Sequence, residues 1–282
     1  MIFWIASYPK SGNTWLRALL ASYYFSKDGN FNQLLLKNIS QFPEKQYFRD
    51  FNYNSKIITD TSRFWIAAQE KINLGKKIRF FKTHNMLGSI NGNNFTNQKN
   101  TIGCIYIVRD PRNVITSFKN HYDFNYDQAL AAMLNENYYI FQSDEKNDYG
   151  NFQLLSSWEK NFQSWKAQKI FPIKFIRYED LLNETFNTLK ETIVFIDKIL
   201  NLKNSFQKLK AQKSIQSTTF LKLKSMEKKE GFIESIFSKK ENKKIPFFHL
   251  GAENDWKKIL DKDYQNKLNS QFQVSLKELQ YI

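Results

Sequence analysis

The first 24 residues constrain the fold of this chain more than any other stretch. Residues 2–6, IFWIA, are a short apolar run with β-branched and aromatic side chains, which is typical of a buried strand. Residues 7–12, SYPKSG, follow with turn-forming proline and glycine. Asn13 or Thr14 can then cap a helix, because apolar residues recur at helical spacing over 15–24. The sequence therefore predicts a strand, a tight loop and a helix in direct succession.

This arrangement suits phosphate binding. The first N–H groups of a helix have no intrahelical partner, and the helix dipole adds partial positive charge there. Lys10 adds a full positive charge to the loop. The nucleotide P-loop places its lysine directly after the second glycine, whereas Lys10 precedes Gly12 by two residues. The alternative is a capped helix after a buried strand, with no ligand.

A second strand–loop–helix is predicted near the middle of the chain. Residues 102–108 form a continuous apolar strand of the kind buried in parallel sheets. The following RDP places an aspartate as helix cap and a proline at the first helical position. Arg109 then lies at the strand tip and Ser117 two turns into the helix, a pairing that suits a dianionic phosphate. The alternative for Arg109 is a structural salt bridge with Asp110 or Asp180.

Further elements complete the predicted fold. Strands are expected at 77–84 and 173–177, and a long helix at 178–200. An aromatic stripe within 154–169 is typical of a helix facing the core. We predict the α/β class: a single domain over 1–282 with a central, mostly parallel sheet flanked by helices. Its architecture is expected to be P-loop-like.

Three polar segments carry weaker signals. Loops with short helices are expected over 26–74, and one of these helices has an inner face that includes Trp65. Residues 123–151 are acidic and aromatic, with helical character near 129–134, and could cover a substrate pocket. The Lys/Glu-rich stretch 228–244 predicts a mobile, solvated loop.

Composition limits the environment and the partners. No Pro/Gly/Ser-rich linker or internal repeat divides the 282 residues, of which 41% are hydrophobic, so one sizeable core is expected. Cys104, the single cysteine, cannot form an intrachain disulfide, which fits a reducing compartment such as the cytoplasm. No basic leader and no apolar run long enough for a bilayer is found, so neither a signal peptide nor a transmembrane segment is predicted.

The chain is strongly basic. Lys and Arg total 42 against 27 Asp and Glu, a net charge of +15, which would attract polyanions, anionic membranes or phosphorylated ligands. The abundance of Lys, Asn, Ile and Phe together is also what AT-rich coding produces, so a solvated surface is the simpler explanation. Neither a nucleic-acid-binding fingerprint nor metal-ligand spacing is present, so no specific nucleic acid and no metal are predicted.

Several motifs carry a family resemblance. YPKSGNTW around Lys10 closely resembles the 5′-phosphate loop of sulfotransferases that use the donor 3′-phosphoadenosine 5′-phosphosulfate (PAPS), and YIVRDPRNVITS resembles their 3′-phosphate element. KTH at 82–84 resembles the Lys-Thr-His of the cytosolic enzymes. RYEDL at 177–181 and TTF at 218–220 resemble the segments near the adenine. Residues 249–257 match the family's Arg-Lys-Gly-x-x-Gly-Asp-Trp-Lys in part.

The resemblance implies a PAPS-dependent sulfotransferase with 3′-phosphoadenosine 5′-phosphate (PAP) as product. The donor-binding residues it implies are, for the 5′ phosphate, Lys10, Ser11, Gly12, Asn13 and Thr14; for the 3′ phosphate, Arg109 and Ser117; for the adenine, Trp15, Tyr178, Thr218, Thr219 and Phe220; and in the last element His249, Leu250 and Gly251. No metal is required, because side chains and backbone dipoles can stabilise sulfuryl transfer.

The implied catalytic residues are His84, Lys10 and Lys82. His84 corresponds to the general base for the acceptor hydroxyl and must be neutral to accept a proton. Lys10 would stabilise charge developing on the leaving phosphate. Lys82 could orient the acceptor or the sulfuryl group.

The last element departs from the family. His249 and Leu250 stand where the family has two basic residues, which leaves Arg109 and Ser117 as the main grip on the 3′ phosphate. Loss of a charge-assisted hydrogen bond costs roughly 1.5–3 kcal/mol. Nearby lysines could compensate: Lys239, Lys240, Lys243 or Lys244.

Two other functions are compatible with these motifs. One is a nucleotide or nucleoside kinase. The position of Lys10 before Gly12 and the second anion site at Arg109 argue against a kinase. The other is a basic glycan- or nucleic-acid-binding protein of the same fold with weakened catalysis.

The acceptor is expected to be a hydroxyl, or an amine, of a small molecule, lipid or glycan. Residues 30–73, 85–100 and 123–150 should shape its pocket, and the positive charge favours an acidic or sugar acceptor. No Lys-Thr-Val-Glu-like dimer segment is found.

Overall fold

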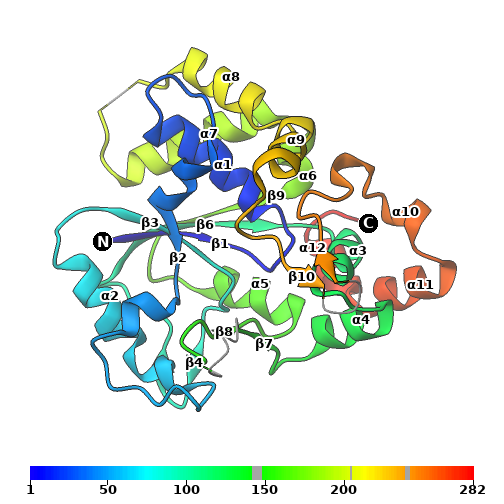
Figure 1. The fold of residues 1–282 in the computed structure, drawn as a ribbon, viewed down its shortest axis with the longest axis horizontal. Helices are drawn as coiled ribbons and strands as arrows, with labels where there is room; N and C mark the ends of the chain where they lie inside the picture. The colour runs from blue at the N-terminus through cyan, green and yellow to red at the C-terminus, as the bar shows by residue number, and fades with distance from the viewer. Residues whose placement is uncertain (142–147, 204, 239–241) are drawn as a thin grey trace.

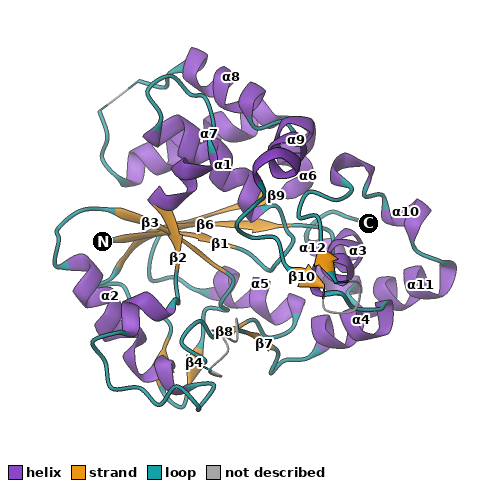
Figure 2. Ribbon diagram, viewed as in Figure 1, coloured by secondary structure: helices purple, strands orange, loops and turns teal. Residues whose placement is uncertain are grey.

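A five-stranded sheet lies at the centre of the computed structural model, which describes residues 1–141, 148–203, 205–238 and 242–282 (Figures 1 and 2). The strand order is β2-β3-β1-β6-β9, and every neighbouring pair is parallel. The strands are β1 (Ile2–Ala6), β2 (Ile39–Gln41), β3 (Arg79–Thr83), β6 (Thr101–Val108) and β9 (Ile173–Arg177). The predicted α/β class with a central parallel sheet is confirmed.

Strand β1 shows why apolar runs form the middle of this sheet. All five of its side chains are fully buried. Phe3 and Ile5 belong to the hydrophobic cluster on one face, and Ile2, Trp4 and Ala6 to the cluster on the other. A strand that is covered on both faces requires apolar residues at every position, which is the pattern of the first predicted strand.

Helices cover both faces of the sheet (Figure 2). The helices on the Phe3 face are α1 (Asn13–Phe25), α6 (Tyr178–Asn183), α7 (Thr185–Ile199), α8 (Lys208–Ser217) and α9 (Phe220–Glu230). Those on the Trp4 face are α2 (Trp65–Asn73), α3 (Pro111–Tyr122), α4 (Tyr126–Leu134), α5 (Trp158–Ala167), α11 (Lys262–Gln271) and α12 (Gln273–Glu278). No helix of the described residues is long and apolar enough to cross a membrane.

Short elements connect these layers. Four 3-10 helices occur among the described residues: η1 (Gln33–Asn38), η2 (Lys45–Phe48), η3 (Asp60–Phe64) and η4 (Gly251–Glu253). Within the described residues, three two-stranded antiparallel sheets pair β4 (Ser89–Ile90) with β5 (Asn93–Asn94), β7 (Tyr139–Ile140) with β8 (Gln153–Leu154), and β10 (Phe237–Ser238) with β11 (Lys243–Lys244). Helix α10 (Trp256–Ile259) packs beside α3.

Two predicted elements differ from the structure. Strand β2 lies inside the stretch 26–74 that was predicted as loops and short helices; it is too short for a clear period, and only Ile39 of its three residues is buried. The helix predicted over 178–200 is interrupted at Glu184, whose φ of −128° and ψ of 51° are not helical. The apolar pattern continues across this break, which is why the sequence suggests one helix.

The stretch 228–244 is not simply a solvated loop. Helix α9 continues to Glu230, and the side chains of Phe232 and Ser238 beyond it are buried. Residues 239–241 lie outside the described part of the chain, and with them Lys239 and Lys240. Residues 142–147 of the predicted pocket cover also lie outside it.

Candidate active site

Most of the predicted site residues gather at one edge of the sheet. Because the strands are parallel, their carboxyl ends meet along the same edge, where open α/β sheets bind ligands. The predicted 5′-phosphate loop follows β1, His84 follows β3, Arg109 follows β6 and Tyr178 follows β9. The structure thus brings together segments from four separate parts of the chain.

The first loop turns on Gly12. This residue has a φ of +97° and caps α1 without a side-chain bond, so the predicted cap at Asn13 or Thr14 is wrong. Asn13 instead donates from Nδ2 to the Ile5 carbonyl oxygen (3.0 Å) and to Ser7 Oγ (3.2 Å), which ties the helix start to the strand end. A Cβ at position 12 would lie 2.4 Å from the Tyr178 ring, so the turn and the close packing both require glycine.

Lys10 is half-buried, and its amine is largely shielded from solvent. Its ammonium sits 3.8 Å from the centroid of the Phe247 ring, a cation–π contact. Burial lowers the pKa of Lys10 to about 7, although the nearby Glu234 carboxylate opposes the shift. Beside it, the Ser11 hydroxyl is buried and has no partner in the described part of the chain. A buried donor without a partner is costly, and a bound oxyanion would satisfy it.

The second loop is joined directly to the first. Arg109 donates from Nη1 to the Lys10 carbonyl oxygen (3.1 Å), and its guanidinium lies 4.2 Å from the centroid of the Tyr178 ring. Its Nε is buried and has no partner among the described residues. The alternative salt bridges are absent from the described chain, because Asp110 and Asp180 pair with other arginines. Ser117 lies half-buried two turns into α3, on the helix that follows Arg109.

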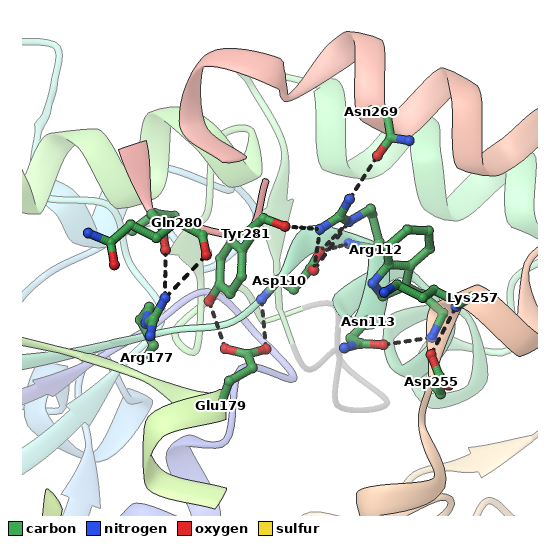
Figure 3. Close-up of polar contacts among 12 residues, drawn as sticks. Asp110, Arg112, Asn113, Arg177, Glu179, Asp255, Lys257, Asn269, Gln280 and Tyr281 are labelled. Carbon is green, nitrogen blue, oxygen red and sulfur yellow. Dashed lines mark hydrogen bonds and ion pairs between the residues drawn. The ribbon is translucent and has the colours of Figure 1, made fainter. Parts of the chain in front are cut away.

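The carboxyl-terminal segment holds this second loop in place (Figure 3). Arg112 pairs with Asp110 (Nη2–Oδ2, 2.7 Å), stacks over Trp256 at 4.0 Å and donates to the Tyr281 carbonyl oxygen. Glu179 accepts from the Asp110 N–H and, at 2.7 Å, from the Tyr281 hydroxyl. The predicted helix cap at Asp110 is confirmed, since its side chain accepts from the Arg112 N–H. The last residues of the chain therefore fix the loop that carries Arg109.

His84 is held by hydrogen bonds that define its tautomer. Its Nδ1 lies 2.8 Å from the Ser7 carbonyl oxygen. A carbonyl can only accept, so Nδ1 carries the proton and Nε2 keeps the lone pair. The backbone of His84 is fixed by Gln153 Oε1 and by Asn161 Nδ2. Burial, reinforced by the charge of Lys82, lowers the pKa of His84 to about 3, which keeps the imidazole neutral at physiological pH.

Lys82 belongs to a buried charge cluster that the sequence did not predict. Glu234 Oε1 accepts hydrogen bonds from Lys82 Nζ (2.5 Å) and Arg17 Nη1 (2.6 Å). Its Oε2 accepts a hydrogen bond from the Thr14 hydroxyl (2.6 Å). Burial alone would raise the pKa of Glu234, but Lys82 and Arg17 hold it well below the usual range. The cluster places a carboxylate against the first turn of α1.

The residues predicted around the adenine occupy different environments. The Trp15 and Tyr178 rings pack edge to face, with centroids 5.9 Å apart. Phe220 lies against Gly251, where a Cβ would come within 2.6 Å of its ring. Thr218 is fully buried, and its hydroxyl donates to a backbone carbonyl of α8. The structure therefore gives Thr218 a packing role, while the three rings remain half-buried.

The divergent last element lies near two lysines. His249 is exposed and Leu250 half-buried, and Thr219 takes the N-cap position of α9 nearby. Lys224 Nζ donates to the His249 carbonyl oxygen (3.2 Å). Burial first, and then the charges of Lys224 and Lys119, lower the pKa of His249. Lys224 and Lys119 place positive charge beside the element, whereas the predicted Lys239 and Lys240 lie outside the described residues.

Sequence reasoning missed several polar residues of the site. Arg17 follows Thr14 by one helical turn, a spacing that places both on one face of α1 and could have revealed it. Glu234 gave no signal within its Lys/Glu-rich stretch. His121 gave none either; after burial, the charge of Lys10 is the largest effect that lowers its pKa. No cluster of three or more potential metal ligands occurs in residues 1–141, 148–203, 205–238 and 242–282.

Comparison with known proteins decides the family. The sequence profile of the sulfotransferase domain matches residues 2–280. The chain is a member of the sulfotransferase family. The resemblance inferred from its two phosphate loops is therefore confirmed at the level of the family.

Individual relatives of this sulfotransferase-family chain are distant. Luciferin sulfotransferase of Photinus pyralis is 27% identical over 207 residues, which cover 70% of this chain and 51% of that protein, so the match spans about half the relative's length. Sulfotransferase 1 family member D1 of Rattus norvegicus is 23% identical over 261 residues, which cover 90% of this chain and 76% of that protein. The fold is shared with a crystal structure of retinol dehydratase in complex with androsterone and inactive cofactor PAP. The TM-score is 0.53 at 18% identity, and the match covers 98% of this chain and 80% of that chain.

Proposed function

We propose that this chain is a PAPS-dependent sulfotransferase that forms one domain over residues 1–282. It would transfer the sulfuryl group of PAPS to a hydroxyl, or an amine, of a small-molecule acceptor and release PAP. When bound, PAPS supplies a sulfuryl group activated by its anhydride bond to a phosphate. The relatives named above are sulfotransferases, and a structural neighbour holds PAP, which supports this donor.

One observation carries the proposal: the two predicted phosphate loops are hydrogen-bonded to each other. The Arg109 guanidinium reaches the Lys10 carbonyl oxygen at 3.1 Å, so one ligand with two phosphates can span both loops. Ser11 Oγ and Arg109 Nε are buried donors without partners in the described chain. Donors of this kind fit phosphate oxygens. A single-phosphate site would not need the second loop.

His84 would accept the proton of the acceptor at Nε2. Its Nδ1–H is committed to the Ser7 carbonyl, so the free lone pair belongs to Nε2. Lys10 would stabilise negative charge on the leaving phosphate. Its lowered pKa does not prevent this role, because a phosphate dianion beside the amine raises the pKa again and favours the charged form.

The molecules named for the relatives support a small planar or apolar acceptor. The Photinus pyralis relative is a luciferin sulfotransferase, and the retinol dehydratase structure contains androsterone. We infer that a phenol or a hydroxylated hydrocarbon is a better acceptor than a sugar. This reverses the preference suggested by the net charge.

Binding of PAP to the purified protein, followed by calorimetry, tests the donor. We expect binding without metal and little binding of ATP with Mg²⁺; preference for ATP would favour a kinase instead. Transfer of labelled sulfate from PAPS to panels of phenols, hydroxysteroids and sugars then tests the reaction. No transfer to any acceptor, together with strong polyanion binding, would favour the glycan-binding alternative.

The His84→Ala variant tests the base. We expect turnover to fall by about 10²–10⁴-fold while PAP affinity stays near that of the wild type, because a general base acts in the chemical step. Added imidazole should restore part of the activity, since it can occupy the space of the lost ring. His249→Ala serves as the contrast: it should change PAP affinity and leave turnover at saturating donor unaffected. Full turnover in His84→Ala would exclude His84 as the base.

A further inference from the structure

The carboxylate of Glu234 occupies a position built for an anion. Three donors from two different elements surround it: the Arg17 guanidinium and Thr14 hydroxyl of α1, and the Lys82 ammonium at the end of β3. The side chains of Arg17 and Lys82 are only 5% and 11% exposed. Arg17 is held in place by a second bond, from Nη2 to the Ile39 carbonyl oxygen (2.9 Å), and its Nε is buried with no partner in the described chain.

The donors belong to the candidate active site. Thr14 is part of the predicted 5′-phosphate loop, and Lys82 lies on β3, two residues before His84. Arg17 lies one helical turn beyond Thr14 on the same face of α1. A carboxylate and a sulfonate are both oxyanions and accept hydrogen bonds from the same donors. The three side chains would therefore bind the sulfonate of the donor as readily as they bind Glu234.

The segment that carries Glu234 is itself firmly attached. Glu227 on α9 accepts from the Ser235 hydroxyl (2.6 Å) and from the backbone N–H groups of Phe247 (2.7 Å) and Phe248 (2.9 Å). The Phe232 ring packs against both phenylalanines, with centroids 4.9 and 5.1 Å apart. Glu234 therefore lies in a packed segment, and the fold itself places its carboxylate in the cluster.

We propose that Thr14, Arg17 and Lys82 form the subsite for the sulfonate end of the donor, and that Glu234 fills this subsite until the donor displaces it. The inference rests on the proposed function. Two anions cannot share one set of donors without strong repulsion, so donor binding requires the Glu234 carboxylate to leave. The apparent affinity is then lowered by the fraction of molecules in which the carboxylate is bound.

The Glu234→Gln variant tests this competition. We expect PAPS to bind about tenfold more tightly than to the wild type, equivalent to about 1.4 kcal/mol. The gain for PAP should be smaller, because PAP lacks the sulfonate. Glu230→Gln is the matched control: it removes one negative charge from the same region, where Glu230 is exposed and bonds only to Gln33 in the described chain. It should leave both affinities unchanged.

Arg17→Gln tests the subsite from the other side. We expect it to weaken PAPS binding about tenfold and PAP binding less, because the guanidinium contacts the group that only PAPS carries. Glu234→Asp guards against misfolding of the glutamine variant, since it keeps the charge but shortens the reach. It should bind PAPS severalfold more tightly than the wild type.

The outcomes separate the two proposals. If the wild type binds PAP but neither Glu234 variant binds PAPS more tightly, the subsite is refuted and the proposed function stands. Equal gains for PAP and PAPS would also refute it, because the carboxylate would then compete with the 5′ phosphate. If the wild type binds neither nucleotide, the proposed function fails and the subsite with it.

Discussion

Replacing Arg112 by methionine should strongly destabilise the protein. The side chains of Arg112 and Asp110 are only 3% and 6% exposed, and they are joined by the Nε–Oδ1 (2.9 Å) and Nη2–Oδ2 (2.7 Å) bonds. Without the guanidinium, the Asp110 carboxylate stays buried with one remaining donor, the backbone N–H of residue 112. Removing one partner of a buried ion pair typically costs about 3–5 kcal/mol, which is the loss we expect in the free energy of unfolding.

Denaturant titration followed by tryptophan fluorescence measures this loss. The double variant Asp110→Asn with Arg112→Met should be less destabilised than Arg112→Met alone, because no uncompensated charge remains. Lys267→Met is the matched control, since Lys267 pairs with Asp263 on the surface, where the two side chains are 50% and 68% exposed, and should change stability little. A loss below about 1 kcal/mol for Arg112→Met would refute the argument. So would a double variant that is less stable than the single one.

Three further predictions concern the site itself. At pH 8 the Lys10 amine, with a pKa of about 7, is mostly neutral in the free protein, and a bound phosphate raises this pKa. Binding of PAP at pH 8 should therefore be accompanied by uptake of on the order of one proton by the protein. The affinity for PAP should fall from pH 7 to pH 9. Calorimetry in buffers of different ionisation enthalpy measures the uptake, and Lys10→Met should abolish it. Gly12→Ala should lower the free energy of unfolding by at least about 1–2 kcal/mol and weaken PAP binding, because φ at this position is +97° and the added Cβ would meet the Tyr178 ring. Denaturant titration measures the first effect and PAP titration the second. Asn161→Ala removes the bond to the His84 carbonyl (2.9 Å) and should lower turnover with PAP affinity retained; unchanged kinetics would contradict this positioning role.

Local patterns were sufficient for the parts of the fold that local forces decide. The apolar runs at 2–6 and 102–108 predicted the two strands at the centre of the sheet, because burial on both faces requires apolar side chains throughout. The RDP sequence predicted the cap at Asp110 and the start of α3 at Pro111, because capping involves neighbours in the chain. The break at Glu184 escaped prediction, since an apolar period continues through it.

Motif spacing also located most of the candidate site, but not its internal contacts. The sequence places Lys10 and Arg109 in two separate loops; the hydrogen bond between them joins residues 99 apart in the chain. The predicted compensation by Lys239, Lys240, Lys243 or Lys244 did not include Lys224 and Lys119, whose charges act on His249. Contacts of this range depend on how the layers pack, and neither residue type nor local period encodes them.

The opening strand–loop–helix and the second loop were determined by the sequence alone, because backbone preference, capping and burial act over a few residues. Only the tertiary structure decided what lies against those loops. It set Gly12 against Tyr178, and it brought Glu234 to Thr14 across 220 residues. The physical reason is that the energy of a buried charge depends on which donors surround it in space. Those donors come from strands and helices that are distant in the chain.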